Sequence, residues 1–178
     1  MKGIVFTEFL ELVENEFGLE VVQQIIDECE LETEGAFTSV GTYNHKDMFI
    51  MVGKLSEIKG IPVPALLSVF GEYFFTTLKT KYPLFLDKPN LFSFLNSIDQ
   101  YIHPEVIKLY PDAELPQFEA EIRSDNEMML NYMSSRKLSD LAIGLIKGAA
   151  KHFKEDVDVV KVVKDAEGAK VLLKVNKI

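Results

Sequence analysis

Three side chains in the second half of the chain have the types and spacing to bind an oxyanion. Tyr132, Ser134 and Arg136 occupy alternate positions in the segment 131–137. If residues 127–135 form a strand, side chains two positions apart leave the same face. A guanidinium binds carboxylate or phosphate through two parallel hydrogen bonds, and hydroxyls add further donors. The pattern predicts a site for an anionic group and leaves carboxylate and phosphate open.

A second candidate for chemistry is His103, about thirty residues upstream. It ends an amphipathic stretch and precedes Pro104. A proline interrupts a helix, so a histidine beside it can point away from the regular helix direction. Two interpretations stay open for His103, a buried structural histidine and an axial metal ligand. The other histidines have simpler explanations, since His45 lies in a polar loop and His152 falls in the last turn of a predicted helix.

Other kinds of chemistry are disfavoured by spacing. The histidines and Cys29 do not match a zinc-binding pattern. Neither Cys29 nor Ser134 has a histidine at a spacing that indicates a catalytic base, and no glycine-rich phosphate loop follows a strand. With Cys29 as the one cysteine, no intrachain disulfide forms, which predicts a reducing compartment.

The charge and the hydropathy of the chain disfavour two classes of partner, nucleic acids and membranes. The chain has 178 residues and a net charge of −9, and acidic residues outnumber Lys and Arg before residue 136. Nucleic acid is disfavoured, because phosphate binding needs clustered basic side chains. No run approaches the roughly 20 apolar residues that span a bilayer, and acidic residues come too early for a signal peptide. We therefore expect a cytoplasmic protein with no membrane contact.

Hydrophobic periodicity predicts an α+β fold in one domain, 1–178. Helical spacing of apolar residues predicts helices over 4–30 with a break at Gly18, 44–59, 64–80, 90–102 and 137–153. Alternation predicts strands over 117–122, 127–133, 157–163 and 169–175. The expected arrangement is a helical N-terminal lobe, about 1–60, followed by an α/β lobe, about 61–178.

These residues together resemble the H-NOX family, the haem nitric oxide/oxygen binding domains. The resemblance rests on His103, the following Lys108-Leu-Tyr-Pro111, Pro116, and Tyr132-x-Ser134-x-Arg136. The opening Met1-Lys-Gly3 and the order of elements agree, so the resemblance covers essentially the whole chain. It implies a helical lobe packed on a lobe with a four-stranded antiparallel sheet, with haem b held noncovalently between them.

The resemblance also assigns roles on the haem. His103 matches the family's axial iron ligand, and Pro116 matches a proline that distorts the porphyrin. The residues matching Tyr132, Ser134 and Arg136 grip the haem propionates, so the resemblance favours carboxylates as the anion.

Gas selectivity follows, on the same resemblance, from the distal side of the haem. Oxygen-binding members carry a tyrosine at the position of Leu141. Phe9 and Phe74 match other polar positions of that network, and Val5 and Leu145 are expected neighbours. A donor to bound dioxygen is a charge-assisted hydrogen bond worth about 1.5 to 3 kcal/mol. Its absence predicts selectivity for nitric oxide over oxygen, with carbon monoxide as a further candidate ligand.

The family resemblance implies a sensor rather than an enzyme, of the stand-alone bacterial type. Nitric oxide at ferrous iron releases the histidine matching His103, one lobe shifts against the other, and a separate histidine kinase or cyclic-dinucleotide enzyme receives the signal. Two alternatives remain from the residues. One is a haem enzyme acting on peroxide, although Leu141 and Phe74 cannot serve as its distal base. The other is a haem-free helical interaction module.

Overall fold

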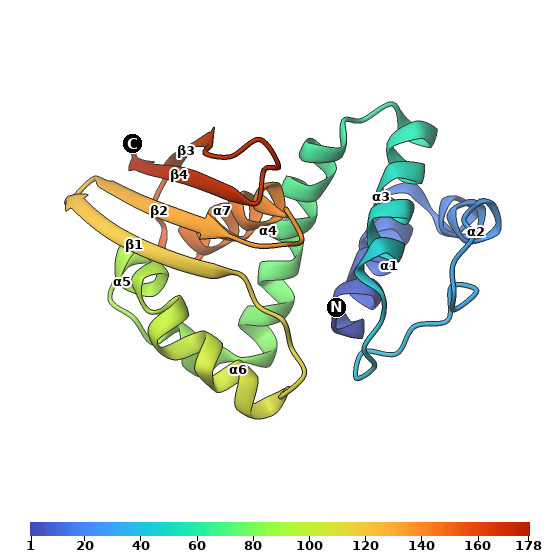
Figure 1. Cartoon of the computed structure of the whole chain (residues 1–178), viewed down its shortest axis with the longest axis horizontal. Helices are drawn as coiled ribbons and strands as arrows, with labels where there is room; N and C mark the ends of the chain where they lie inside the picture. Colours follow the sequence, from blue (N-terminus) through green and yellow to red (C-terminus); the bar gives the residue numbers. More distant parts are fainter.

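The computed structural model describes residues 1–178 as helices packed on a single antiparallel sheet (Figure 1). The α-helices are α1 Gly3–Phe17, α2 Leu19–Glu28, α3 His45–Lys59, α4 Val63–Lys81, α5 Leu91–Asn96, α6 His103–Leu109 and α7 Ser139–Phe153. Two shorter helical segments are the 3-10 helix η1, Pro83–Leu86, and the π-helix η2, Ile98–Ile102. The strands are β1 Gln117–Ser124, β2 Glu127–Met133, β3 Val157–Val163 and β4 Lys170–Lys177.

The sheet has the order β1-β2-β4-β3, and every neighbouring pair is antiparallel. Alternate residues of the two central strands face a buried side, including Leu130 opposite Leu173. Helices α5 and α7 contribute to the same core, together with Phe75 from α4. This sheet core follows from strand alternation, because one face of the sheet collects the apolar side chains.

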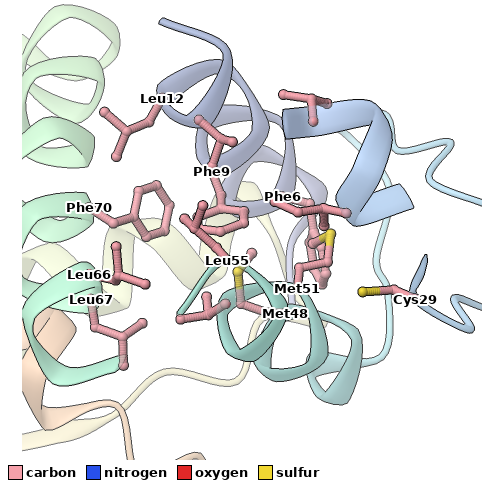
Figure 2. Close-up of a cluster of buried hydrophobic side chains, with 14 of the residues drawn as sticks. Phe6, Phe9, Leu12, Cys29, Met48, Met51, Leu55, Leu66, Leu67 and Phe70 are labelled. Carbon is pink, nitrogen blue, oxygen red and sulfur yellow. The ribbon is translucent and has the colours of Figure 1, made fainter. Parts of the chain in front are cut away.

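A second core lies in the helical N-terminal part (Figure 2). Phe9 of α1 packs edge-on against Phe70 of α4, with ring centroids 5.4 Å apart. Met48 and Met51 of α3 are fully buried in the same cluster. Helix α4 therefore contributes to both cores, and in Figure 1 it runs between the N-terminal helices and the sheet. The lobe division at residue 60 stays a prediction.

Helices α4 and α7 cross at glycines, and their backbones are in direct contact. A Cβ atom on Gly144 would lie 2.0 Å from the Ser68 carbonyl oxygen and 2.8 Å from the Gly71 Cα atom. A Cβ atom on Gly71 would lie 2.3 Å from the Leu141 carbonyl oxygen. These distances are impossible for real side chains, so the crossing requires glycine on both helices.

The predicted elements agree with the structure except near His103 and after β2. The expected helix over 90–102 is divided into α5 and η2, and α6 begins at His103 itself. Helix α4 begins at Val63, one residue before its predicted start, because Pro64 is tolerated in the first turn of a helix. Strand β2 ends at Met133, so the assumption of a strand reaching residue 135 was wrong.

No single helix is long and apolar enough to cross a bilayer; α3 and α4 pass that test only as a pair, bent by 113°.

The α4–α7 crossing can be tested with one methyl group. We expect Gly144→Ala to lower the free energy of unfolding by about 1–3 kcal/mol, because the new atom overpacks a backbone contact. Gly53→Ala is the matched control, since Gly53 lies inside α3 with no atom within 4 Å of the added Cβ. It should gain about 0.5–1 kcal/mol from helix propensity. Urea denaturation measures both; a Gly144→Ala protein as stable as the parent would contradict the crossing.

Candidate functional site

A large apolar cavity lies between the helices and the sheet. Its volume is about 330 Å³, within the usual range for small-molecule sites, and 25 of its 32 lining residues are hydrophobic. One wall comes from η2 and α6, and another from α1, α4 and α7. The loop after α6 and the inner faces of β1 and β2 complete the lining. Such a cavity suits a large apolar ligand with a few polar groups.

His103 lines this cavity from the first position of α6. The preceding π-helix places one extra residue in the turn, so the His103 amide donates to the Ile98 carbonyl, five residues back. Its side chain is 18% exposed, and Nδ1 lies 2.7 Å from Oδ1 of Asp99. Burial lowers the pKa of His103 while Asp99 opposes that shift. The lowered pKa favours the neutral imidazole, which is the form that binds metals.

Tyr132 is buried at the end of β2, and its phenol supports the local fold as well as the cavity. The phenol oxygen accepts a hydrogen bond of 3.0 Å from the amide of Leu138, the residue before α7. Burial raises the pKa of Tyr132, and hydrogen bonds from Ser134 and the Leu138 amide oppose the rise. A hydroxyl that accepts from an amide still has its own hydrogen to donate.

Ser134 and Arg136 lie in the turn that follows β2, not on the strand. The Ser134 hydroxyl accepts from the Arg136 amide at 3.2 Å, and Lys137 has a positive φ of 55°. Both side chains nevertheless line the cavity with Tyr132. The turn thus achieves the convergence that an extended strand was expected to provide.

Arg136 lines the cavity and carries one buried hydrogen-bond donor that has no partner. Its two terminal nitrogens bond the carbonyl and the carboxylate of Glu114, at 3.0 and 2.9 Å. Its Nε is buried and has no partner. The Glu114 side chain is 76% exposed, so this ion pair is a weak competitor for an incoming anion. A polar groove shares Ser134, Arg136 and Glu114 with the cavity, so the donors lie at one polar end.

The predicted distal residues fall on the α1, α4 and α7 side, with one exception. Val5, Phe74, Leu141 and Leu145 all line the cavity, as does Pro116 from the loop before β1. Phe9 does not. Its side chain is 1% exposed in the N-terminal core and packs against Phe70, so its place in the distal pocket stays a prediction.

Other polar groups around the cavity were not predicted. The hydroxyls of Tyr82 and Tyr110 line it and bond each other at 2.9 Å, and burial followed by this bond raises the pKa of Tyr82 to about 12. Asp99 was not singled out either, although its spacing of four residues from His103 is a helical contact distance that the sequence displays. No sequence pattern pointed to the tyrosine pair, which is 28 residues apart.

The arrangement of histidine, apolar cavity and polar anion anchors agrees with a protein family. The profile of the haem-NO-binding family, HNOB, matches residues 2–161. The chain belongs to the haem-NO-binding (H-NOX) family. The family consists of haem-binding sensor domains, so this H-NOX chain is a sensor domain and not an enzyme.

Solved H-NOX structures share the whole fold. The Fe(II) unliganded H-NOX protein from K. algicida is 39% identical with a TM-score of 0.95, covering 100% of this chain and 97% of that one. The H-NOX from Shewanella woodyi in the Fe(II)CO state is 39% identical with a TM-score of 0.84, covering 100% and 95%. The H-NOX from S. oneidensis in the Fe(II)NO state is 25% identical with a TM-score of 0.91, covering 100% and 99%. The α+β architecture predicted from sequence is confirmed.

The residues of this H-NOX chain fit a haem. The cavity is mostly apolar, as a porphyrin requires, and it is lined by His103, whose pKa burial lowers. The polar end has a buried, unpartnered Nε on Arg136 and a phenol hydrogen on Tyr132, both suited to carboxylates. His103 would hold the iron, and Tyr132, Ser134 and Arg136 would hold the propionates.

The structural role of the Tyr132 phenol predicts a stability loss. Tyr132→Phe removes the acceptor for the Leu138 amide, and an unpaired buried donor costs about 1–3 kcal/mol. The free energy of unfolding should therefore fall by that amount in urea denaturation. Tyr101→Phe is the control, because the Tyr101 side chain is exposed and its hydroxyl makes no hydrogen bond within the protein. This variant should change the free energy of unfolding by no more than about 0.5 kcal/mol. Equal stability of the two variants would show that the phenol does not support α7.

Proposed function

We propose that this H-NOX domain is a haem b sensor that binds nitric oxide in preference to oxygen, through His103 as the axial ligand. The observation that carries the proposal is that the cavity lining combines one histidine with a set of side chains that have no hydrogen-bond donor. A histidine stands on the α6 wall, and the α1, α4 and α7 side presents Val5, Phe74, Leu141 and Leu145. When bound, ferrous haem supplies the iron that coordinates a diatomic gas.

The apolar side chains explain the expected gas preference. Dioxygen draws negative charge to its outer atom and gains about 1.5 to 3 kcal/mol from a hydrogen-bond donor, whereas nitric oxide needs less such help. Val5, Phe74, Leu141 and Leu145 carry no donor. The Tyr82 and Tyr110 hydroxyls form one hydrogen bond with each other at the ends of α4 and α6, so one of their two hydrogens is already used. Selectivity for nitric oxide thus arises from the omission of a donor, and carbon monoxide, which needs none, is expected as a further ligand.

His103 is also the starting point for signal transmission. It is the first residue of α6, so a change in the bond between His103 and the metal would act directly on that helix. The residue after the end of α6, Tyr110, bonds Tyr82 at the end of α4. Asp112 in the following loop bonds Lys2 and Thr42 of the N-terminal part, at 3.2 and 2.6 Å. These contacts support a shift of one lobe against the other when α6 moves.

The receiver is expected to be a separate cytoplasmic signalling protein, such as a histidine kinase or a cyclic-dinucleotide enzyme. Membership of the H-NOX family supports this class of partner.

The absorption spectrum of the ferrous protein tests the proposal. We expect a haem band that is unchanged in air and shifts when nitric oxide is added. A band that shifts reversibly with oxygen at ambient pressure would overturn the selectivity and leave the haem site intact. Protein that stays colourless after haem reconstitution would refute the haem assignment altogether and favour the interaction module. Peroxide turnover well above that of free haem would favour the enzyme.

His103→Gly is the matched variant for the axial ligand. It should lose haem during gel filtration and retain it when imidazole is supplied, since the free base can occupy the vacated position. Full haem retention without imidazole would show that another residue holds the iron.

Introducing a hydrogen-bond donor at position 141 should shift the gas preference toward oxygen. Leu141→Tyr places a hydroxyl on the apolar side and should raise oxygen affinity about 10- to 100-fold, which corresponds to a charge-assisted hydrogen bond. Leu141→Phe adds the same ring without the hydroxyl and should leave oxygen affinity near that of the parent. Oxygen titration of the ferrous proteins measures the difference. Equal affinities in the Tyr and Phe variants would remove the donor as the cause.

A further inference from the structure

Asp99 connects His103 to the sheet through its two carboxylate oxygens. Oδ1 lies 2.7 Å from Nδ1 of His103, and Oδ2 accepts a 2.7 Å hydrogen bond from the amide of Phe118 in β1. The Phe118 ring packs beside the imidazole, with centroids 5.9 Å apart. Asp99 is therefore held by a strand while it touches the histidine.

The Asp99–His103 contact depends on the π-helix. The two residues span the junction of η2 and α6, where amides donate to carbonyls five residues back. Oδ1 is buried and has no hydrogen bond of full geometry, and Nδ1 of His103 lies 2.7 Å from it. Buried polar atoms usually have a partner, so a carboxylate oxygen this close to an imidazole nitrogen points to a role in holding the ring.

We propose that Asp99 is a positioning residue for His103, fixing which imidazole nitrogen is offered to the metal and how strongly it donates. This inference rests on the proposed function, since it concerns His103 as an iron ligand. A proton held on Nδ1 by the carboxylate leaves Nε2 as the lone-pair nitrogen. A carboxylate partner also raises the basicity of a metal-bound histidine.

Two physical consequences follow for this chain. The Phe118 amide of β1 holds Asp99, and Asp99 in turn contacts the His103 ring. Rotation of that ring is therefore restrained by β1 as well as by α6. A more basic His103 would hold a metal more firmly. Asp99, and the sheet through the Phe118 amide, would therefore influence how easily His103 and the metal separate.

Resonance Raman spectroscopy of the ferrous protein tests the role. Asp99→Asn should move the iron–histidine stretching band to lower wavenumber and release haem about 10-fold faster, the usual effect of losing a partner of a metal ligand. Glu105→Gln is the control, because Glu105 lies on α6, the helix that His103 begins, and pairs with the exposed Lys108. It should change neither quantity. An unshifted band in Asp99→Asn would overturn the inference.

A second experiment keeps Asp99 intact and avoids any dependence on how Asp99→Asn folds. In His103→Gly, imidazole can donate to Asp99, whereas 1-methylimidazole has no N–H to donate. Imidazole should support haem binding about 10-fold or more tightly, as expected for a hydrogen bond to a charged group.

The outcomes separate the two levels of inference. Equal support by both bases, in protein that needs a base to keep haem, would refute the role of Asp99 and preserve His103 as the ligand. Haem retention in His103→Gly without any base would refute the proposed ligand itself.

Discussion

The close crossing of α4 and α7 is the constraint on which the rest of the structure depends. Backbone contact at Gly71 and Gly144 brings the helices too near for side chains to separate them. Each core then forms on its own side of the pair, the N-terminal core against α4 and the sheet core against α7. The crossing also sets Leu141 and Phe74 on the same cavity. Helix packing therefore determines the shape of the cavity wall that α4 and α7 form. A few side chains on that wall determine whether it offers a hydrogen-bond donor.

The polar end of the cavity combines support with recognition. Tyr132 accepts from the amide that precedes α7, and Ser134 accepts from the Arg136 amide within the turn. Both hydroxyls are held by backbone amides, and the Tyr132 phenol still has a hydrogen to donate. Donors fixed in this way lose little conformational entropy when a ligand arrives, which favours binding by preorganisation. Arg136 is less fixed, because it shares its charge with the exposed Glu114.

Much of the architecture was predictable because hydrophobic periodicity is local. Strand alternation and helical spacing placed most elements within a few residues, and the histidine–tyrosine–serine–arginine pattern indicated the cavity before its shape was known. The features that the sequence did not show are those that distant packing decides. The π-helix before His103 has no distinct residue pattern, and the orientation of Phe9 depends on Phe70 across the core. The Tyr82–Tyr110 pair requires the fold to bring two helix ends together. The sequence shows Asp99 at helical spacing from His103. It does not show the hydrogen bond between Asp99 and the Phe118 amide of β1, which holds the carboxylate in place.

The π-helix also limits how this segment can vary over evolution. Substitutions within Ile98–Ile102 change side chains, whereas loss of one residue would let the turn rewind as a regular α-helix. Because a π-turn holds one extra residue, such a loss would alter the turn itself and leave the helical residues on either side in phase. A loss between Asp99 and His103 would also shorten their spacing from four residues to three and so change the geometry of their contact.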